Sequence, residues 1–304
     1  MLIRRTLLWL STRRALRRWV ETSPVARRVT SRFIAGLQLQ DALEVCRRLN
    51  AQGVLVTLDH LGEHVVSAEQ VHASRQAYLE ALGQIYELGL NSTVSVKLSQ
   101  FGLDVSESLC YENVEAVVRE AARVGTSVEI DMESLAYVDR TLALVRRLHA
   151  RYGHVRGVIQ AYLRRSREDL QLLCEAGVPV RLCKGAYSEP PSAAFTSRRQ
   201  IRQNFLRLAE ILLARGVYPG FATHDQWLIM EILRRARERG LAPDSYEFQM
   251  LYGIRRELGR RLVADGCRVR LYVPYGDAWY PYFMRRLGEH PSNLLLLLVN
   301  LVRG

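Results

Sequence analysis

The chain has 304 residues, with 43 Lys and Arg against 31 Asp and Glu, so its net charge is +12, and 48% of its residues are hydrophobic. This apolar content is enough for one large core and excludes a disordered tail or a scaffold made only of charges. Lysine occurs only at Lys97 and Lys184, which leaves 41 arginines. The two lysines are either remnants of codon bias or sites that need a compact ammonium group, so their positions matter.

The five cysteines lie far apart and form no C-x-x-C pair or Cys/His cluster. This pattern disfavours a disulfide framework or a zinc module and indicates a reducing compartment. No apolar run reaches the roughly 18–20 residues that span a bilayer. We therefore expect a cytoplasmic protein, with peripheral contact at the inner face of the cell membrane as an alternative.

Residues 1–52 are expected to form a helical lead-in, followed by a catalytic domain over 53–304. Residues 1–30 hold eight arginines and one acid, Glu21. This composition suits a transit peptide, a membrane-surface helix or the outer face of N-terminal helices. Apolar residues continue at helical spacing through Leu43 and Leu49, which favours the third interpretation. An apolar run at 294–299 is interpreted as a docking segment.

The rest of the chain alternates short β-rich runs with longer helical stretches. The runs lie at 53–60, 93–99, 126–133, 155–162, 178–185, 220–225, 245–251 and 268–276. Their spacing of about 30 residues suits a strand plus a crossover helix. Helical periodicity is clearest at 68–89, 135–153 and 225–240, and each stretch ends at a glycine. Eight such units predict an α/β fold, a closed (β/α)8 barrel of the TIM type. A doubly wound sheet is the alternative, but no strand is followed by a dinucleotide or P-loop glycine motif.

Each predicted strand has one apolar and one polar phase, such as Val94 and Val96 against Ser95 and Lys97. Both faces of a parallel barrel are buried, so the polar phase should point inside, where charges need partners. Polar residues early in the strands are expected to form a deep ion-pair network: Glu129, Glu247, Arg268 and Arg270. Polar residues late in the strands are expected to ring the C-terminal mouth, where barrel enzymes carry their chemistry: Asp59, His60, Lys97, Asp131, Glu133, Gln160, Tyr162, Arg181, Lys184, Thr223, His224, Gln249 and Tyr272.

Three kinds of enzyme fit such a mouth. A buried lysine can form a Schiff base, and Lys97 or Lys184 would serve. A metal-dependent hydrolase would need paired His ligands, but His60 and His224 stand alone, so no metal is expected. The excess of cations favours the third kind, which binds a large anionic cofactor and a small anionic substrate. A non-enzyme alternative, a basic surface protein for nucleic acid or anionic lipid, rests only on the net charge.

Five segments carry a resemblance to a known family: 160-QAYLRRS, 179-PVRLCKGAY, 221-FATHD, 246-YEFQMLYG and 271-LYVPYGDAWYPYFMRRLGEHPSN. They resemble proline dehydrogenase, in order along most of the chain, and the chain is similar to the short monofunctional bacterial form. The resemblance implies a distorted (β/α)8 barrel with noncovalent FAD at its mouth. It also implies a final helix that lies over the flavin instead of alongside the barrel.

The resemblance assigns roles to individual residues. Asp131 and Arg181 match the catalytic pair, and Glu63 is expected to pair with Arg285 as a gate over the site. Residues implied in binding the proline carboxylate or lining the substrate pocket are Lys97, Arg285, Arg286, Tyr272, Leu251 and Tyr187. Residues implied in binding FAD are Met132, Gln160, Arg181, Lys184, Gly185, Ala186, Thr223, His224 and Glu289. Cys183 stands where relatives often have Val and is a candidate oxidation-sensitive neighbour of the flavin.

The implied reaction is oxidation of L-proline to Δ1-pyrroline-5-carboxylate, the first step of proline catabolism to glutamate. Hydride would move from the ring carbon next to nitrogen onto FAD, and a membrane quinone would take the electrons. A downstream pyrroline-5-carboxylate dehydrogenase is an implied partner, and nucleic acid is not expected to bind. Hydroxyproline is the alternative substrate.

Overall fold

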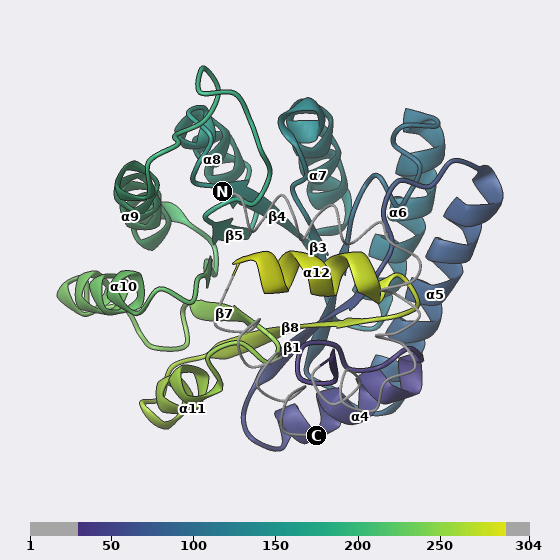
Figure 1. Cartoon of the computed structure of the whole chain (residues 1–304), viewed down its shortest axis with the longest axis horizontal. Coiled ribbons are helices and arrows are strands. Elements are labelled where there is room, and N and C mark those ends of the chain that lie inside the picture. The colour runs from purple at the N-terminus through teal and green to yellow at the C-terminus, as the bar shows by residue number, and fades with distance from the viewer. Residues whose placement is uncertain (1–29, 290–304) are drawn as a thin grey trace, which may run out of the picture.

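The computed structural model describes residues 30–289, with side chains through Met284. Between those bounds, eight parallel strands close a barrel in chain order, and the last strand pairs with the first (Figure 1). The strands are β1 (Leu55–His60), β2 (Ser92–Val96), β3 (Val128–Ile130), β4 (Val155–Gln160), β5 (Val180–Cys183), β6 (Gly220–Ala222), β7 (Glu247–Leu251) and β8 (Val269–Tyr275). Seven lie within the runs that the sequence predicts, and β2 begins one residue before its run, so the predicted (β/α)8 barrel is confirmed.

Helices surround the strands, as the 3.6-residue periodicity predicts. They are α4 (Leu39–Asn50), α5 (Ala68–Glu87), α6 (Glu107–Arg123), η1 (Leu135–Tyr137), α7 (Val138–Tyr152), α8 (Ser166–Glu175), α9 (Arg198–Arg215), α10 (Gln226–Glu238), α11 (Arg256–Ala264) and α12 (Trp279–Glu289). The hydroxyl of Ser67 caps the start of α5 by accepting from the backbone N–H of Gln70. Gly153 ends α7 at φ +73°, a left-handed conformation that glycine adopts without a Cβ clash.

The main core fills the space between the apolar phase of the strands and the helices around them. Val94, Val96 and Ile130 are fully buried there, together with Tyr78 of α5 and Phe205 of α9. The apolar strand phase therefore faces the helices, which leaves the polar phase for the barrel interior.

α12 departs from this pattern because it crosses the C-terminal end of the barrel (Figure 1). Its apolar residues Trp279, Tyr280 and Phe283 form a second buried cluster with Phe33 and with Leu61, which follows β1. The rings of Phe33 and Phe283 lie 6.2 Å apart, centroid to centroid. A helix held by loops at this end covers the mouth, as the resemblance implies, and does not extend the outer ring.

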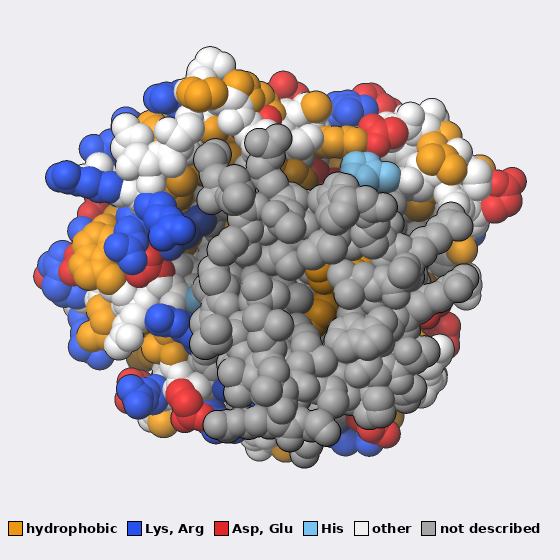
Figure 2. All heavy atoms as spheres, viewed as in Figure 1, with side chains coloured by type: hydrophobic (Ala, Val, Ile, Leu, Met, Phe, Trp, Pro, Cys, Tyr) orange, Lys and Arg blue, Asp and Glu red, His pale blue; other side chains and the backbone are white. Residues whose placement is uncertain are grey.

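Much of the positive charge lies on the outer helices. Figure 2 shows Lys and Arg side chains gathered at the edge of the molecule where Figure 1 places α9 and α10. Many of these cations pair with carboxylates on the same or a neighbouring helix, as Arg235 Nε of α10 does with Glu210 Oε1 of α9 at 2.7 Å. Within the described part of the chain, every helix is too short or too polar to span a bilayer.

Candidate active site

Five side chains meet at the mouth and are called the mouth cluster: Asp59, Lys97, Asp131, Arg181 and Tyr272. The Lys97 ammonium Nζ lies 3.0 Å from Asp59 Oδ1 and 3.3 Å from Asp131 Oδ2. The Tyr272 hydroxyl donates to Asp131 Oδ2 at 2.8 Å, and Arg181 Nη1 donates to Asp131 Oδ1 at 2.6 Å. The five residues come from five different strands or strand ends, and three of them, Lys97, Arg181 and Tyr272, contact the Asp131 carboxylate.

The parallel register explains this convergence. Asp131 follows the last residue of β3, and its backbone N–H donates to the carbonyl of Val96 at 2.9 Å. Lys97 follows β2 directly, and Thr57 of β1 is in register with Tyr272 of β8. Because side chains alternate along a strand, these polar positions face inward at similar heights. Both the alternation and the strand ends could be predicted from the sequence.

Opposed effects act on the charge of Lys97. Burial disfavours the ammonium, but the carboxylates of Asp59 and Asp131 outweigh it and raise the pKa of Lys97 well above its usual value. Burial, followed by the charge of Asp131, also raises the pKa of Tyr272 well above normal. At neutral pH the mouth cluster therefore presents a protonated lysine and a phenol that donates its hydrogen. A permanently charged ammonium is a poor Schiff-base nucleophile, which argues against the aldolase interpretation.

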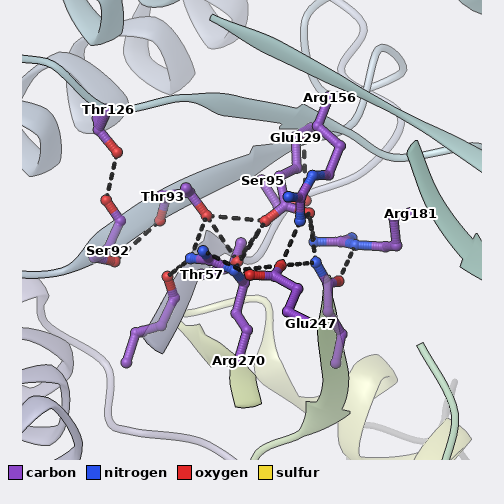
Figure 3. Close-up of polar contacts among 12 residues, drawn as sticks. Thr57, Ser92, Thr93, Ser95, Thr126, Glu129, Arg156, Arg181, Glu247 and Arg270 are labelled. Atoms are coloured by element: carbon purple, nitrogen blue, oxygen red, sulfur yellow. Dashed lines mark hydrogen bonds and ion pairs between the residues drawn. The ribbon is translucent and has the colours of Figure 1, made fainter. Parts of the chain in front are cut away.

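Below the mouth lies a second set of charged and polar side chains, called the lower network: Glu129, Arg156, Glu247, Gln249 and Arg270. Figure 3 labels its four charged members, and Gln249 Nε2 donates to Glu247 Oε1 at 2.7 Å. Glu247 Oε1 accepts from Arg270 Nε at 2.8 Å and also pairs with Arg156. The deep ion-pair network predicted from the sequence is present, and Glu129, Glu247 and Arg270 belong to it.

Two residue placements predicted from the sequence were wrong. Arg268 lies before β8 and is exposed, with Nη1 donating to the Tyr218 hydroxyl at 3.2 Å. Arg156 of β4 takes the buried position instead. Gln249, predicted at the mouth, lies lower down and bridges Arg181 Nε and Glu247 Oε1 through its amide at 2.6 and 2.7 Å. The Gln249 side chain extends from its strand toward the lower network, and the direction of a side chain cannot be predicted from its position in the sequence.

A third group lies after β5 and β6, where Lys184 and Asp225 follow the strands and Arg202 belongs to the first turns of α9. Lys184 Nζ and Arg202 Nε both donate to Asp225 Oδ2, at 2.7 and 2.6 Å. Burial opposes the charge of Asp225, but the two cations lower its pKa. Their side chains are 38% and 47% exposed, so two cations around one carboxylate leave net positive charge facing outward.

The remaining residues implied in cofactor binding lie around the same rim. Gly185 has φ +99°, and a Cβ there would stand 2.1 Å from Cδ1 of Tyr162, so its backbone packs against that ring and excludes any side chain. Gln160 Nε2 donates to the carbonyl of Glu133 at 2.8 Å, and His224 Nε2 accepts from the backbone N–H of Leu251 at 2.9 Å. Met132 and Thr223 are buried, and Ala186 is exposed.

The substrate-pocket residues divide into described and undescribed side chains. Leu251 packs against the buried apolar cluster that holds α12. Burial and the charge of Glu133 raise the pKa of Tyr187, and the charges of Glu63 and Lys97 also act on it, so this partly buried tyrosine lies near the mouth. Arg285, Arg286 and Glu289 fall within the bounds of α12, but their side chains lie outside the described residues.

Two residues that shape the site were given no role by the sequence. Asp59 was placed at the mouth, but only the structure pairs its buried carboxylate, 1% exposed, with Lys97. Arg156 was hidden because Val158 interrupts the polar alternation of β4. Burial raises the pKa of the Cys183 thiol to about 11, which disfavours the reactive thiolate, and its sensitivity to oxidation stays a prediction.

Chemically, this arrangement suits small carboxylates and a larger anion, with cations held in place by buried carboxylates. Among residues 30–289 no group of three or more His, Cys, Asp and Glu side chains is placed to hold a metal ion.

Comparison with known proteins gives a consistent answer. The family model described as proline dehydrogenase matches residues 42–295. Proline dehydrogenase 2 of Bacillus subtilis (strain 168) is 38% identical over 269 residues, 88% of this chain and 89% of that protein. The proline dehydrogenase of Deinococcus radiodurans is 35% identical over 281 residues, 91% of each chain.

A solved structure shares the fold. Proline utilization A (PutA) from Bdellovibrio bacteriovorus, inactivated by N-propargylglycine, superposes with a TM-score of 0.80 at 25% identity. The match covers 86% of this chain and 32% of that one, so this chain spans about a third of the PutA chain. The family model and the bacterial relatives together cover nearly the whole barrel, and the chain therefore belongs to the proline dehydrogenase family.

Proposed function

We propose that this oxidoreductase converts L-proline to Δ1-pyrroline-5-carboxylate at the barrel mouth, with noncovalent FAD as the hydride acceptor. Family membership supports proline oxidation, the first step of proline catabolism, as the reaction. The observation that carries the proposal is the mouth cluster, in which Lys97 and Arg181 are held as cations on either side of Asp131. When bound, FAD supplies a two-electron acceptor for the hydride from the ring carbon next to nitrogen, while the amine loses a proton as the C=N bond forms.

The residues around the mouth fit such a cofactor. The outward-facing charge of Lys184 and Arg202 suits a pyrophosphate, and the side-chain-free backbone at Gly185 permits close approach. Further contacts are proposed for Met132, Gln160, Ala186, Thr223, His224 and Glu289. Arg181 would add fixed positive charge beside the cofactor, which stabilises the negative charge gained on reduction.

For the substrate, we assign the proline carboxylate to Lys97 together with Arg285 and Arg286. An ammonium and two guanidinium groups would hold the carboxylate rigidly and orient the ring for reaction. Tyr272, Leu251 and Tyr187 would line the ring pocket. Glu63, which acts electrostatically on Lys97, is proposed to pair with Arg285 and gate entry.

Outside the site, a membrane quinone is proposed as electron acceptor, which requires peripheral membrane contact. The basic residues 1–29 and the apolar run at 294–299 lie outside the described residues and are the segments proposed to make it. Sedimentation with acidic-lipid vesicles at low salt checks this contact, and a failure to sediment contradicts it. A downstream pyrroline-5-carboxylate dehydrogenase is the proposed consumer of the product.

The decisive experiment is an anaerobic titration of the purified protein with L-proline. We expect a yellow protein whose flavin absorbance bleaches with proline and bleaches far less in Lys97→Met at the same proline concentration, because the carboxylate loses a ligand. Hydroxyproline added to the same protein tests the alternative substrate. A colourless protein retained on DNA supports the nucleic-acid alternative, and borohydride trapping of a substrate adduct on lysine supports the aldolase alternative; either outcome contradicts the proposal.

A further inference from the structure

Arg181 is held at three of its nitrogen atoms by three different side chains. Nε donates to Gln249 Oε1 at 2.6 Å, Nη1 to Asp131 Oδ1 at 2.6 Å, and Nη2 lies 2.6 Å from Glu129 Oε2. A guanidinium is planar, so the hydrogen bonds at Nε and Nη1 fix its plane, and the close ion pair at Nη2 further restricts its position. Figure 3 shows Arg181 and Glu129 facing each other inside the barrel.

Glu129 is itself held firmly. Its Oε1 accepts from the hydroxyls of Thr57 and Thr93, at 2.7 and 2.9 Å, while Oε2 faces Arg181. Its side chain is 1% exposed. Glu129 and Asp131 are two residues apart on β3 and its continuation, so both carboxylates face the barrel interior. Both pair with the Arg181 guanidinium, Glu129 from below and Asp131 from the mouth.

The other buried glutamate has different partners. Glu247 pairs with Arg156 and Arg270, and its Oε2 accepts from the hydroxyl of Tyr218 at 3.0 Å. A cavity of about 160 Å³ at the opposite end of the barrel is lined by Arg156, Arg270, Glu129 and Tyr218, among others. Glu129 lines this cavity and also lies directly against Arg181, so it connects the lower part of the barrel to the mouth cluster, whereas Glu247 reaches Arg181 only through Gln249.

Distance separates these two roles. Glu129 lies 2.6 Å from Arg181 but 3.8 and 3.9 Å from Arg156 and Arg270. Glu247 pairs closely with Arg156 and Arg270, while Arg181 has Glu129 and Asp131 as its carboxylate partners. An arginine that loses one of two buried partners keeps its charge but loses a geometric constraint, and it shifts toward the partner that remains. Loss of Glu129 would leave Arg181 drawn toward Asp131 and Gln249.

We propose that Glu129 is a positioning residue that fixes the orientation of the Arg181 guanidinium beneath the substrate and cofactor. This inference rests on the proposed function, because it gives a catalytic consequence to an ion pair inside the barrel. Lys97, the proposed carboxylate ligand, is held by Asp59, Asp131 and Tyr272, so the loss of Glu129 should spare proline binding while turnover falls.

The test compares Glu129→Gln with Glu247→Gln. Both variants replace a fully buried, arginine-paired carboxylate by an amide of the same shape, so both lose one negative charge in the same region. We expect kcat to fall about tenfold in Glu129→Gln with an almost unchanged KM for proline, since a small misplacement of a catalytic group costs that much. Glu247→Gln should lower the thermal midpoint comparably but reduce kcat less, because Glu247 reaches Arg181 only through Gln249.

A second readout does not depend on turnover. The visible circular dichroism of bound FAD reports on the charged groups beside it, and we expect it to change in Glu129→Gln and to stay as in the wild type in Glu247→Gln. Equal kcat and equal dichroism in the two variants would overturn the positioning role.

If Glu129→Gln does not fold, Thr57→Val replaces it. This variant keeps every charge and removes one of the two hydroxyls that hold Glu129, and its control is Thr141→Val, a buried threonine of α7. A kcat reduced about threefold only in Thr57→Val supports the inference, and equal kcat in both contradicts it. Wild-type protein whose FAD is not reduced by proline contradicts the proposed function itself, whereas reduced wild-type FAD with indistinguishable variants contradicts only the role of Glu129.

Discussion

Lys97 illustrates how much a single residue depends on its neighbours. One of only two lysines in the chain, it is buried and would lose its proton if burial acted alone. Asp59 and Asp131 reverse that outcome, and Asp59 does so from a position where its other oxygen, Oδ2, has no hydrogen-bond partner. Burial raises the pKa of Asp59 and the charge of Lys97 opposes that rise, so each of the two groups favours the charged form of the other.

At this scale we predict that Asp59→Asn shifts the pH dependence of proline binding. In the wild type, the raised pKa of Lys97 keeps the ammonium charged above the usual lysine value of about 10.4. Without Asp59, burial lowers the pKa, so Lys97 deprotonates at lower pH. The KM for proline, measured between about pH 7 and 10, should rise at lower pH in the variant than in the wild type.

Asp225→Asn is the matched control, because Asp225 pairs with Lys184 and not with Lys97. Its KM profile should follow that of the wild type. Superimposable profiles for Asp59→Asn and the wild type would show that Asp59 does not control the charge of Lys97.

At the scale of single elements, α12 differs most from its neighbours. Periodicity predicts an apolar helical face, but the same face would suit a helix on the outside of the barrel. The cluster with Phe33 and Leu61 places α12 across the mouth instead. The resemblance to a family, and not the local pattern, implied this position in advance.

We predict that Phe283→Ala damages the site more than it damages the barrel. Phe283 of α12 is buried against Phe33 and against Trp279 of the same helix, so its loss weakens the attachment of the helix that carries Arg285 and Arg286. The KM for proline should rise about tenfold or more, because both proposed carboxylate ligands move with the helix.

Phe248→Ala is the comparison, since Phe248 of β7 is fully buried in the main core. A Phe→Ala change in a core typically costs about 3–5 kcal/mol, so this variant should lower the thermal midpoint more while changing KM less. The opposite ranking of the two variants in KM would show that α12 does not hold the substrate ligands.

At the scale of the whole molecule, an ionic column runs along the inside of the barrel. Asp59, Asp131, Glu129 and Glu247 are matched by four cations, Lys97, Arg156, Arg181 and Arg270. Buried charges of one sign alone would be costly, so this balance makes a polar barrel interior compatible with a stable fold.

We predict that this column makes the protein sensitive to acid. Burial would raise the pKa of Glu129, but Arg181, Arg156 and Arg270 lower it to about 2, and Arg270 and Arg156 likewise lower that of Glu247. Because an unfolded glutamate titrates near about 4.3, the stabilisation is complete above that pH and is lost as pH falls toward about 2. Glu133 acts in the opposite direction, since burial raises its pKa and its protonation favours the folded state.

The contribution of Glu247 is therefore measured as the difference in thermal midpoint between the wild type and a variant that lacks this carboxylate. Thermal midpoints of the wild type and Glu247→Gln, taken by circular dichroism from about pH 7 to pH 2, should converge at acid pH. The variant lacks the proton-linked contribution of Glu247, so its midpoint falls less steeply. Parallel curves would assign acid sensitivity to other groups.

The sequence by itself determined the eight strands, their polar phase and the residues that end them, because these features depend on local periodicity. It therefore predicted that Lys97, Asp131, Arg181 and Tyr272 share one end of a barrel. Roles for the individual residues came from the resemblance to a family.

Only the tertiary structure decided which polar groups pair. Arg156 lies inside the barrel, Arg268 lies outside it, and the Gln249 amide contacts the lower network. Asp59 pairs with Lys97, and Glu129 pairs with Arg181. The physical reason is that closure of the barrel brings together side chains from strands that are not neighbours in the chain. Their reach across the interior depends on strand tilt and side-chain length, which no local pattern records.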